Sequence, residues 1–151
     1  MDDNTNGAGA PKEGKRLSLL WVFAMLNYLY CDIVTLMDPG QLKQFLSGSV
    51  EGMQIDQAFL LGASVLMEIP IAMVLLSRTL AHRPNRLANI IAGTIMTAVQ
   101  LATLLSGTPT PYYIFFSIVE IATTLFIVQY AWRWTVRRPD QDDCGVQPSR
   151  A

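Results

Sequence analysis

Three acidic side chains stand inside long apolar runs of this 151-residue sequence. Asp32, Glu68 and Glu120 each lie in a stretch long enough to cross a membrane, and no lysine, arginine or histidine stands at the same depth. An ionisable group at the centre of a membrane helix costs about 2.5–3.5 kcal/mol to insert. Such carboxyls can hold protons, bind a cation or line a hydrated cavity, and each of these is chemistry that proton- or cation-handling membrane proteins use.

Each of these three stretches also carries a polar stripe, and so does a fourth apolar stretch, which contains Asn89 and Gln100. Helical residues that are three, four or seven positions apart share a face, and polar faces of membrane helices normally turn toward protein or water. Four such stripes predict one polar bundle interior with an acidic centre. The predicted ion- or substrate-binding residues are Glu68, Glu120, Asp32, Gln100, Asn27 and Asn89. The stripes are Tyr28, Asp32 and Thr35, with Asn27 beside them; Ser64, Glu68 and Ala72; Asn89, Gly93, Met96, Gln100 and Thr103; and Tyr113, Ser117, Glu120 and Thr124.

A purely structural role for the same carboxyls stays open. Protonated acids can hydrogen-bond between helices and hold them together. Pro70 follows Glu68 by two residues and cannot donate to the carbonyl of Leu66, so we expect a kink there. The freed carbonyl would suit a proton or cation site, although prolines in membrane helices commonly produce the kink alone.

The elements that must position these residues are four apolar stretches, at residues 17–37, 58–76, 87–105 and 112–134. A helix needs roughly 20 residues to cross a hydrocarbon core about 30 Å thick, and all four stretches are near that length. Each is apolar around most of its circumference, which is typical of a helix in lipid. We therefore predict an all-α fold, an integral membrane four-helix bundle at residues 15–138.

Lysine and arginine predict the orientation of this bundle. All but one of the 11 lie before the first stretch, between the second and third, or at or beyond the C-terminal end of the fourth, and the exception is Lys43. By the positive-inside rule, both termini face the cytoplasm. The polar residues 1–14 and 139–151 are predicted to be disordered cytoplasmic tails. The aromatic residues expected at the membrane interfaces are Trp21, Trp132 and Trp134 on the inner side and Tyr112 and Tyr113 on the outer side.

The outer loop, residues 38–57, is predicted to contain a short helix. Asp38 can cap its first turn, Pro39 suits the first helical position, and Gln41 follows three residues after Asp38. We expect this helix to be amphipathic and to lie at the outer surface, either covering the bundle or acting as a lid. Its apolar face is predicted to hold Leu42, Phe45, Leu46, Val50 and Met53.

The composition argues against several classes of protein. Hydrophobic residues make up 51% and charged residues 15%, whereas a soluble domain carries about 25% charged residues. A net charge of −1 gives no basic field to attract nucleic acid. Two cysteines and one histidine are too few for a disulfide framework or a metal site. We expect no metal, no cofactor, no catalytic residue and no nucleic-acid partner.

Several short motifs are familiar from one protein family. They are Tyr30-Cys31-Asp32, Leu36-Met37-Asp38-Pro39-Gly40, Met67-Glu68-Ile69-Pro70-Ile71-Ala72-Met73, Arg86-Leu87-Ala88-Asn89-Ile90-Ile91-Ala92-Gly93 and Ala131-Trp132-Arg133-Trp134. Over residues 17–135 the chain resembles a prokaryotic family of small four-helix integral membrane proteins of unknown function. The resemblance implies a multi-pass protein of the cytoplasmic membrane and no particular activity. The architecture is also loosely similar to that of DoxX-type proteins.

Two functional hypotheses follow, from different classes. In the first, the acidic interior binds or moves protons or small cations, and the protein is a homo-oligomer because one four-helix bundle is narrow. In the second, the chain is a non-transporting membrane subunit or scaffold. A membrane redox enzyme is less favoured, because the sequence has no histidine pair for haem and no CxxC motif.

Overall fold

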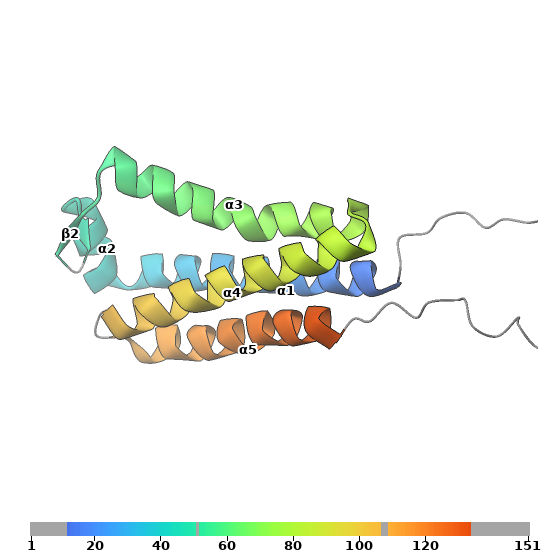
Figure 1. Cartoon of the computed structure of the whole chain (residues 1–151). Coiled ribbons are helices and arrows are strands. Elements are labelled where there is room, and N and C mark those ends of the chain that lie inside the picture. The colour runs from blue at the N-terminus through green and yellow to red at the C-terminus, as the bar shows by residue number, and fades with distance from the viewer. Residues whose placement is uncertain (1–11, 51, 107–108, 134–151) are drawn as a thin grey trace, which may run out of the picture.

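The computed structural model describes residues 12–50, 52–106 and 109–133, and these residues are almost entirely helical (Figure 1). Four long helices run alongside one another, and a short helix and a two-stranded hairpin connect the first two of them. The predicted all-α, four-helix fold is confirmed. The elements are α1 (Lys12–Met37), α2 (Pro39–Leu46), β1 (Ser49–Val50), β2 (Met53–Gln54), α3 (Gln57–Thr79), α4 (His82–Ser106) and α5 (Pro111–Arg133).

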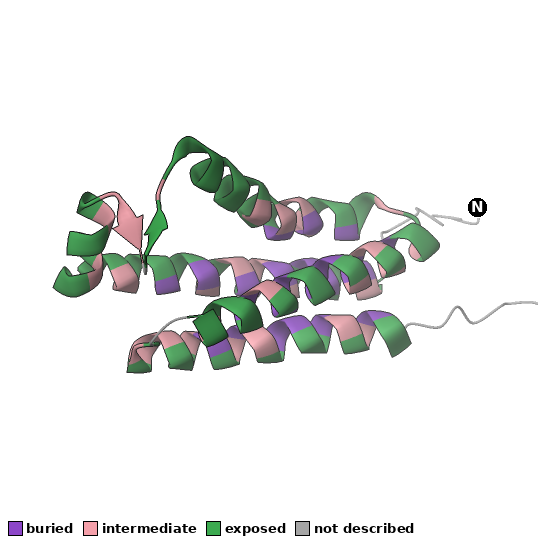
Figure 2. Cartoon of the chain, turned by 60° about the vertical axis from the view of Figure 1, so that its left-hand side comes forward, coloured by how far each residue is buried: buried purple, intermediate pink, exposed green. Residues whose placement is uncertain are grey.

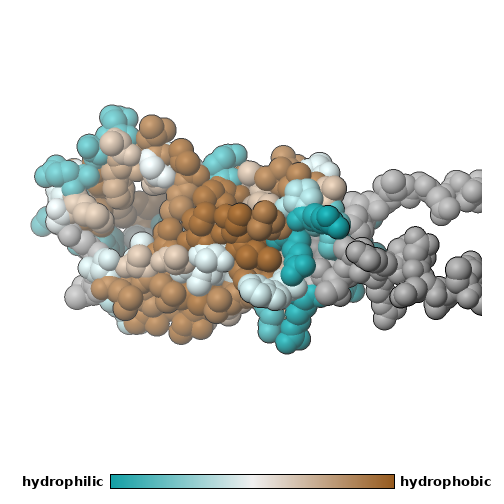
Figure 3. All heavy atoms as spheres, viewed as in Figure 1, coloured by the Kyte–Doolittle hydropathy of each residue, from teal (hydrophilic) through white to brown (hydrophobic). Residues whose placement is uncertain are grey.

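The four long helices are each long and apolar enough to cross a membrane. Figure 3 shows apolar residues across the middle of the molecule and polar residues toward its two ends, which indicates a membrane protein. We call one end the basic end, because it holds Arg16, Arg78, Arg83, Arg86 and Arg133. The opposite end, which carries α2, β1 and β2, is called the hairpin end.

The helices extend past the predicted apolar stretches at the basic end. α1 begins at Lys12 and α4 begins at His82. The residues added to α1 include lysine, glutamate and arginine, which are good helix formers, and Pro84 of α4 stands in the first turn, where proline is tolerated. The predicted tail at 1–14 is therefore too long, since its last three residues are helical. Trp134 and the predicted tail at 139–151 lie outside the described residues.

α1 lies between two neighbours in the bundle. It packs on α3 on one side and on α5 on the other, and α4 packs along α5. The buried apolar side chains of the described residues form one core cluster, and Figure 2 shows buried segments along α1, α4 and α5 but only in the part of α3 nearer the basic end. The cluster holds Leu17, Trp21, Ala24, Tyr28, Met73, Ala92, Met96 and Ile127.

Two glycines allow helices to approach closely. A Cβ atom on Gly93 of α4 would lie 2.6 Å from Cγ2 of Val128 on α5. A Cβ atom on Gly14 of α1 would lie 2.5 Å from the carbonyl oxygen of Ser77 on α3. Small residues at such crossings are the usual way in which membrane helices gain packing area.

α3 separates from the bundle toward the hairpin end (Figures 1 and 2). Every residue from 57 to 65 is exposed, whereas Pro70, Met73 and Ser77 are buried. Pro70 lies where this change occurs, and it supplies no backbone N–H to the carbonyl of Leu66. The hairpin-end half of α3 therefore packs little against the other described residues of the chain.

The connection between α1 and α3 differs from the prediction. Asp38 caps α2, its Oδ1 accepting from the Gly40 N–H at 2.8 Å, as expected. The helix ends at Leu46, however, because Gly48 has a positive φ of 75° that continues no α-helix. Val50 and Met53 were expected on the apolar face of this helix and instead pair across the β1–β2 hairpin.

Candidate functional site at a buried carboxyl

Glu120, in the middle of α5, carries a carboxyl group into the bundle, and the residue is only 1% exposed. Its Oε1 atom has no hydrogen-bond partner within the described part of the chain. No ion pair between described residues neutralises the group either. A buried carboxyl normally has its hydrogen-bonding capacity satisfied, so this side chain is the clearest polar anomaly of the fold.

Glu120 reaches the interior because α5 presents one polar face to α4 and α1. Ser117 and Thr124, three residues before and four after it, are also buried. Nε2 of Gln100 donates to Oγ of Ser117 at 2.8 Å, and Oγ1 of Thr97 donates to Oγ1 of Thr124 at 2.8 Å. These bonds fasten α4 to α5 on either side of Glu120. The predicted inward positions of Glu120 and Gln100 are confirmed.

α1 completes the surroundings of this carboxyl. Tyr28 and Cys31 are buried, and the charge of Glu120 is within electrostatic range of both. The hydroxyl of Tyr28 is a second buried polar atom without a partner among the described residues. Two unsatisfied oxygens, one able to donate and one able to accept, therefore lie in the same interior.

The remaining predicted residues of α1 lie at the margin of this interior. Asp32 interacts electrostatically with Glu120 but is exposed. Asn27 is half-buried, and its Nδ2 donates to the backbone oxygen of Phe116 at 3.4 Å. Of the stripe predicted for α1, Tyr28 is therefore buried in the interior, whereas Asp32 is exposed at its edge.

Glu68 corrects the prediction of a shared acidic interior. Its side chain is exposed on α3, as is that of Ser64 from the same expected stripe. The stripe was expected to face inward because a polar face in a membrane needs cover, but the half of α3 that carries it separates from the other helices. Only Glu120 of the three membrane-depth acids is buried within the single chain.

Asn89 also lies elsewhere than expected. It is buried toward the basic end, about 16 Å from the level of Gln100 at ~1.5 Å per residue, so it does not join Glu120. Its Oδ1 accepts from Trp21 Nε1 at 2.7 Å and from Ser77 Oγ at 3.3 Å. Its Nδ2 donates to Asn85 Oδ1 at 2.7 Å. This cluster holds α1, α3 and α4 together.

The asparagine cluster contains residues that sequence reasoning placed wrongly or missed. Trp21 was predicted at the membrane interface, yet it is 0% exposed and donates into the cluster. Asn85 Nδ2 donates to the carbonyl oxygen of Ser77 at 2.7 Å, which satisfies a carbonyl in the last turn of α3 that has no helical partner. The four-residue spacing of Asn85 and Asn89 was the available signal, because it puts both on one face.

The donor set around Glu120 suits a proton better than a metal ion. Among the described residues, no group of three or more histidine, cysteine, aspartate or glutamate side chains could hold a metal. Hard cations such as Ca²⁺ take six to eight oxygen ligands. A lone carboxyl with a hydroxyl and a thiol nearby can instead bind, share and release one proton.

The fold and this site define a small four-helix protein with membrane-length helices and a buried acid whose Oε1 atom has no partner in the described part of the chain. The chain belongs to a family of unknown function (DUF6326), whose model matches residues 10–140. No curated protein matches the chain, and no solved structure does. The family match agrees with the expected resemblance to an uncharacterised family and adds no activity.

Proposed function

We propose that this protein is a membrane protein that binds a proton at Glu120 and exchanges it with the hairpin side of the bilayer. The observation that carries the proposal is the buried Oε1 atom, which has no partner among the residues that the structure describes. An isolated ionised carboxylate is strongly unfavourable in an apolar interior. The carboxyl is therefore stable there with a proton bound, and losing that proton requires a partner or a change of conformation.

Two residues of α1 would serve this exchange. Asp32 is exposed and within electrostatic range of Glu120, and we assign it the exchange of a proton with the outside, through water between the two carboxyls. Tyr28 can donate its unpaired hydroxyl to the carboxylate when the proton has left. A small cation is the less favoured guest, because the described part of the chain offers one buried carboxyl and no ligand cluster.

The proposal includes a location. Lysine and arginine collect at the basic end, and cytoplasmic loops of membrane proteins carry an excess of these residues. We therefore assign the protein to a prokaryotic cytoplasmic membrane, with both termini in the cytoplasm and the hairpin end outside. In this orientation Asp32 connects Glu120 to the external side.

The proposal also includes a homo-oligomer and no enzymatic role. Glu68 is exposed in the middle of α3, and a carboxyl in contact with hydrocarbon is costly. A second protomer against α3 would cover it. We assign no catalytic residue and no cofactor, because the chemistry available at Glu120 is proton binding.

Proton flux into liposomes tests the proposal. Purified protein is reconstituted with a pH-sensitive dye inside, and flux is driven by a potassium diffusion potential. We expect Glu120→Gln to reduce the flux at least tenfold, because glutamine cannot exchange a proton. Glu68→Gln is the matched control, since it makes the same change on α3, outside the buried site on α5, and it should retain the wild-type flux. Equal flux from wild type and Glu120→Gln would refute proton exchange at this residue.

Infrared spectroscopy separates proton binding from proton movement. A protonated Glu120 contributes a carbonyl stretch of a carboxylic acid that Glu120→Gln abolishes and Glu68→Gln leaves in place. If the band is present but flux is absent, the non-transporting alternative, a membrane subunit with a structural acid, is favoured. A stoichiometric partner that co-purifies with wild type and Glu120→Gln alike would favour it further.

A further inference from the structure

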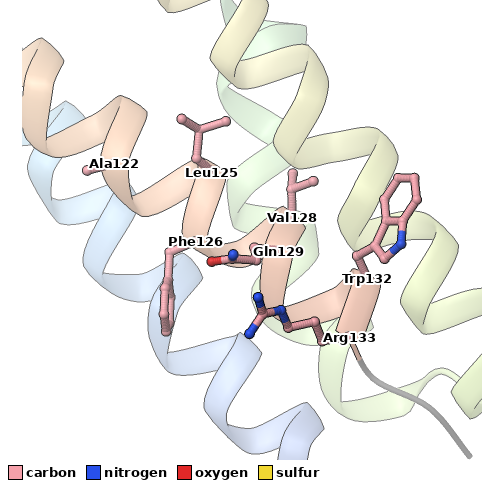
Figure 4. Close-up of a pocket in the computed structure, with 7 residues that line it drawn as sticks. All are labelled: Ala122, Leu125, Phe126, Val128, Gln129, Trp132 and Arg133. Atoms are coloured by element: carbon pink, nitrogen blue, oxygen red, sulfur yellow. The ribbon is translucent and has the colours of Figure 1, made fainter.

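Two open grooves flank the Trp132 side chain at the basic end. The first, of about 640 Å³, runs along the outward face of α5 (Figure 4). The second, of about 550 Å³, is lined by residues of α4. Trp132 lines both grooves and is 65% exposed. Its indole thus stands as a ridge between them.

The first groove changes character along its length. Leu125 and Phe126 make its part nearer the middle of the bundle apolar, whereas Gln129 and Arg133 line the part at the basic end. Figure 4 shows the amide of Gln129 and the guanidinium of Arg133 on the same side of α5, beside the ring of Phe126. The two polar residues are four positions apart, or about 6 Å along the helix.

The second groove repeats this order on α4. Arg83 and Arg86 line it at the basic end, and Leu87 and Ile90 follow toward the middle. Nη2 of Arg86 donates to the carbonyl oxygen of Trp132 at 3.0 Å. This bond satisfies a carbonyl in the last turn of α5, and it ties Arg86 of the second groove to the residue that precedes Arg133 of the first.

We propose that the paired grooves on either side of Trp132 form a binding site for an anionic phospholipid. Acyl chains would lie along Leu125 and Phe126, and the headgroup phosphate would pair with Arg133 and the arginines of α4. The amide N–H of Gln129, about 6 Å deeper, can donate to an ester carbonyl of the lipid. The order of apolar, amide and guanidinium groups matches the order of chain, ester and phosphate in a glycerophospholipid.

The occupant follows from the position of the site. The groove residues lie on the outward faces of membrane-length helices, where the bilayer itself supplies the ligand. Tryptophan is enriched at the headgroup level, and clustered arginines favour anionic over zwitterionic headgroups. Free phosphate would meet the guanidinium groups but would leave the apolar part of the groove without a ligand.

Native mass spectrometry from mixed micelles tests this site. Protein is exchanged into detergent with equal amounts of phosphatidylglycerol and phosphatidylcholine of the same acyl chains, and retained lipid is counted. We expect wild type to retain phosphatidylglycerol at least fivefold over phosphatidylcholine. Arg133→Gln and Gln129→Leu should each lower that retention at least threefold. Arg78→Gln removes an exposed charge at the same end but outside both grooves, so it should leave retention unchanged.

A thermal shift measurement supplies the second arm. Phosphatidylglycerol should raise the melting temperature of wild type, and inorganic phosphate at the same concentration should not. Equal loss of lipid retention in Arg78→Gln and Arg133→Gln would show a non-specific charge effect and overturn the site. A shift with inorganic phosphate alone would assign the arginines to a soluble anion and would also overturn it. Both target residues are exposed, so a folding defect is not expected, and circular dichroism checks it.

Discussion

The two ends of this bundle differ in how their polar groups are satisfied. At the basic end, Trp21, Ser77, Asn85 and Asn89 are buried and bonded to one another across three helices. Toward the hairpin end, α3 is exposed on every residue from 57 to 65, and Glu120 carries an unpaired oxygen. Stability is therefore concentrated at one end, and the chemically unsatisfied groups lie toward the other.

Such a division has a physical consequence for motion. Regions with few buried contacts open at low free-energy cost, whereas densely bonded regions open only with global unfolding. A protein that must expose a buried carboxyl can do so by moving its less supported half while the bonded end stays closed. Substitutions at the two ends should therefore differ in their cost to stability.

The largest expected effect on stability comes from the asparagine cluster. Asn89→Ala would leave the indole N–H of Trp21, the hydroxyl of Ser77 and Asn85 Oδ1 without their partner. We expect a loss of about 3 kcal/mol, since each buried unsatisfied group costs ~1–3 kcal/mol and relaxation offsets part of it. The measurement is the free energy of unfolding in a mixed-micelle titration.

The control for this prediction is Asn27→Ala. Asn27 is half-buried and makes one long bond of 3.4 Å, so its removal should cost less than about 1 kcal/mol. Equal losses from the two asparagines would contradict the proposed difference between the cluster and the rest of the bundle.

The next largest effect on stability is expected when a Cβ atom is added to a glycine, and two glycines allow a matched comparison. Gly14→Ala would bring a Cβ atom to 2.5 Å from the Ser77 backbone oxygen at the basic end, and overpacking of this kind costs about 1–3 kcal/mol. Gly62→Ala, on the exposed half of α3, meets nothing within 4 Å. It should stabilise the helix by about 0.5–1 kcal/mol, because alanine is the better helix former. Thermal unfolding of both variants checks the opposite signs.

Substitution of two tryptophans should produce a smaller difference in stability. Trp21→Phe keeps a ring in the core and removes the donor to Asn89, so we expect a loss of about 1–2 kcal/mol. Trp132→Phe changes an exposed ring and should fall within about 0.5 kcal/mol of wild type. Equal losses of unfolding free energy in the two variants would contradict the proposed contribution of the buried hydrogen bond from Trp21 to Asn89.

The smallest effect on stability is expected at Glu120. Glu120→Gln replaces a neutral acid by a neutral amide, and the Oε1 atom has no partner in the described residues to lose. The free energy of unfolding should change by less than about 1 kcal/mol. A loss above about 2 kcal/mol would show that the carboxyl holds the helices together, as the structural alternative requires.

The sequence predicted the face of α5 but not that of α3. Ser117, Glu120 and Thr124 repeat at helical spacing, and α5 has neighbours on both sides that cover this face. Ser64 and Glu68 repeat at the same spacing, yet no helix among the described residues covers them. Spacing defines which residues share a face, whereas cover depends on helix packing, which the pattern of one helix does not contain.

Trp21 and Val50 show two other limits of sequence reasoning. A tryptophan near the end of an apolar stretch is typical of an interface, and only the position of Asn89 on another helix reveals a buried partner. The apolar spacing through Val50 and Met53 predicted a continuing helix, but Gly48 at positive φ ended it. In both cases a contact or backbone angle outside the local pattern decided the structure.

The connection at the hairpin end has a consequence for how far α1 and α3 stand apart. α2 is capped by Asp38, the strands pair at Val50 and Met53, and the Ile55 N–H donates to the Gly48 carbonyl oxygen at 2.9 Å. These bonds lie within the connection, so the connection has a defined shape. It therefore helps to set the distance between the C-terminal end of α1 and the N-terminal end of α3. The spread of the bundle is thus a property of its connector as much as of its helices.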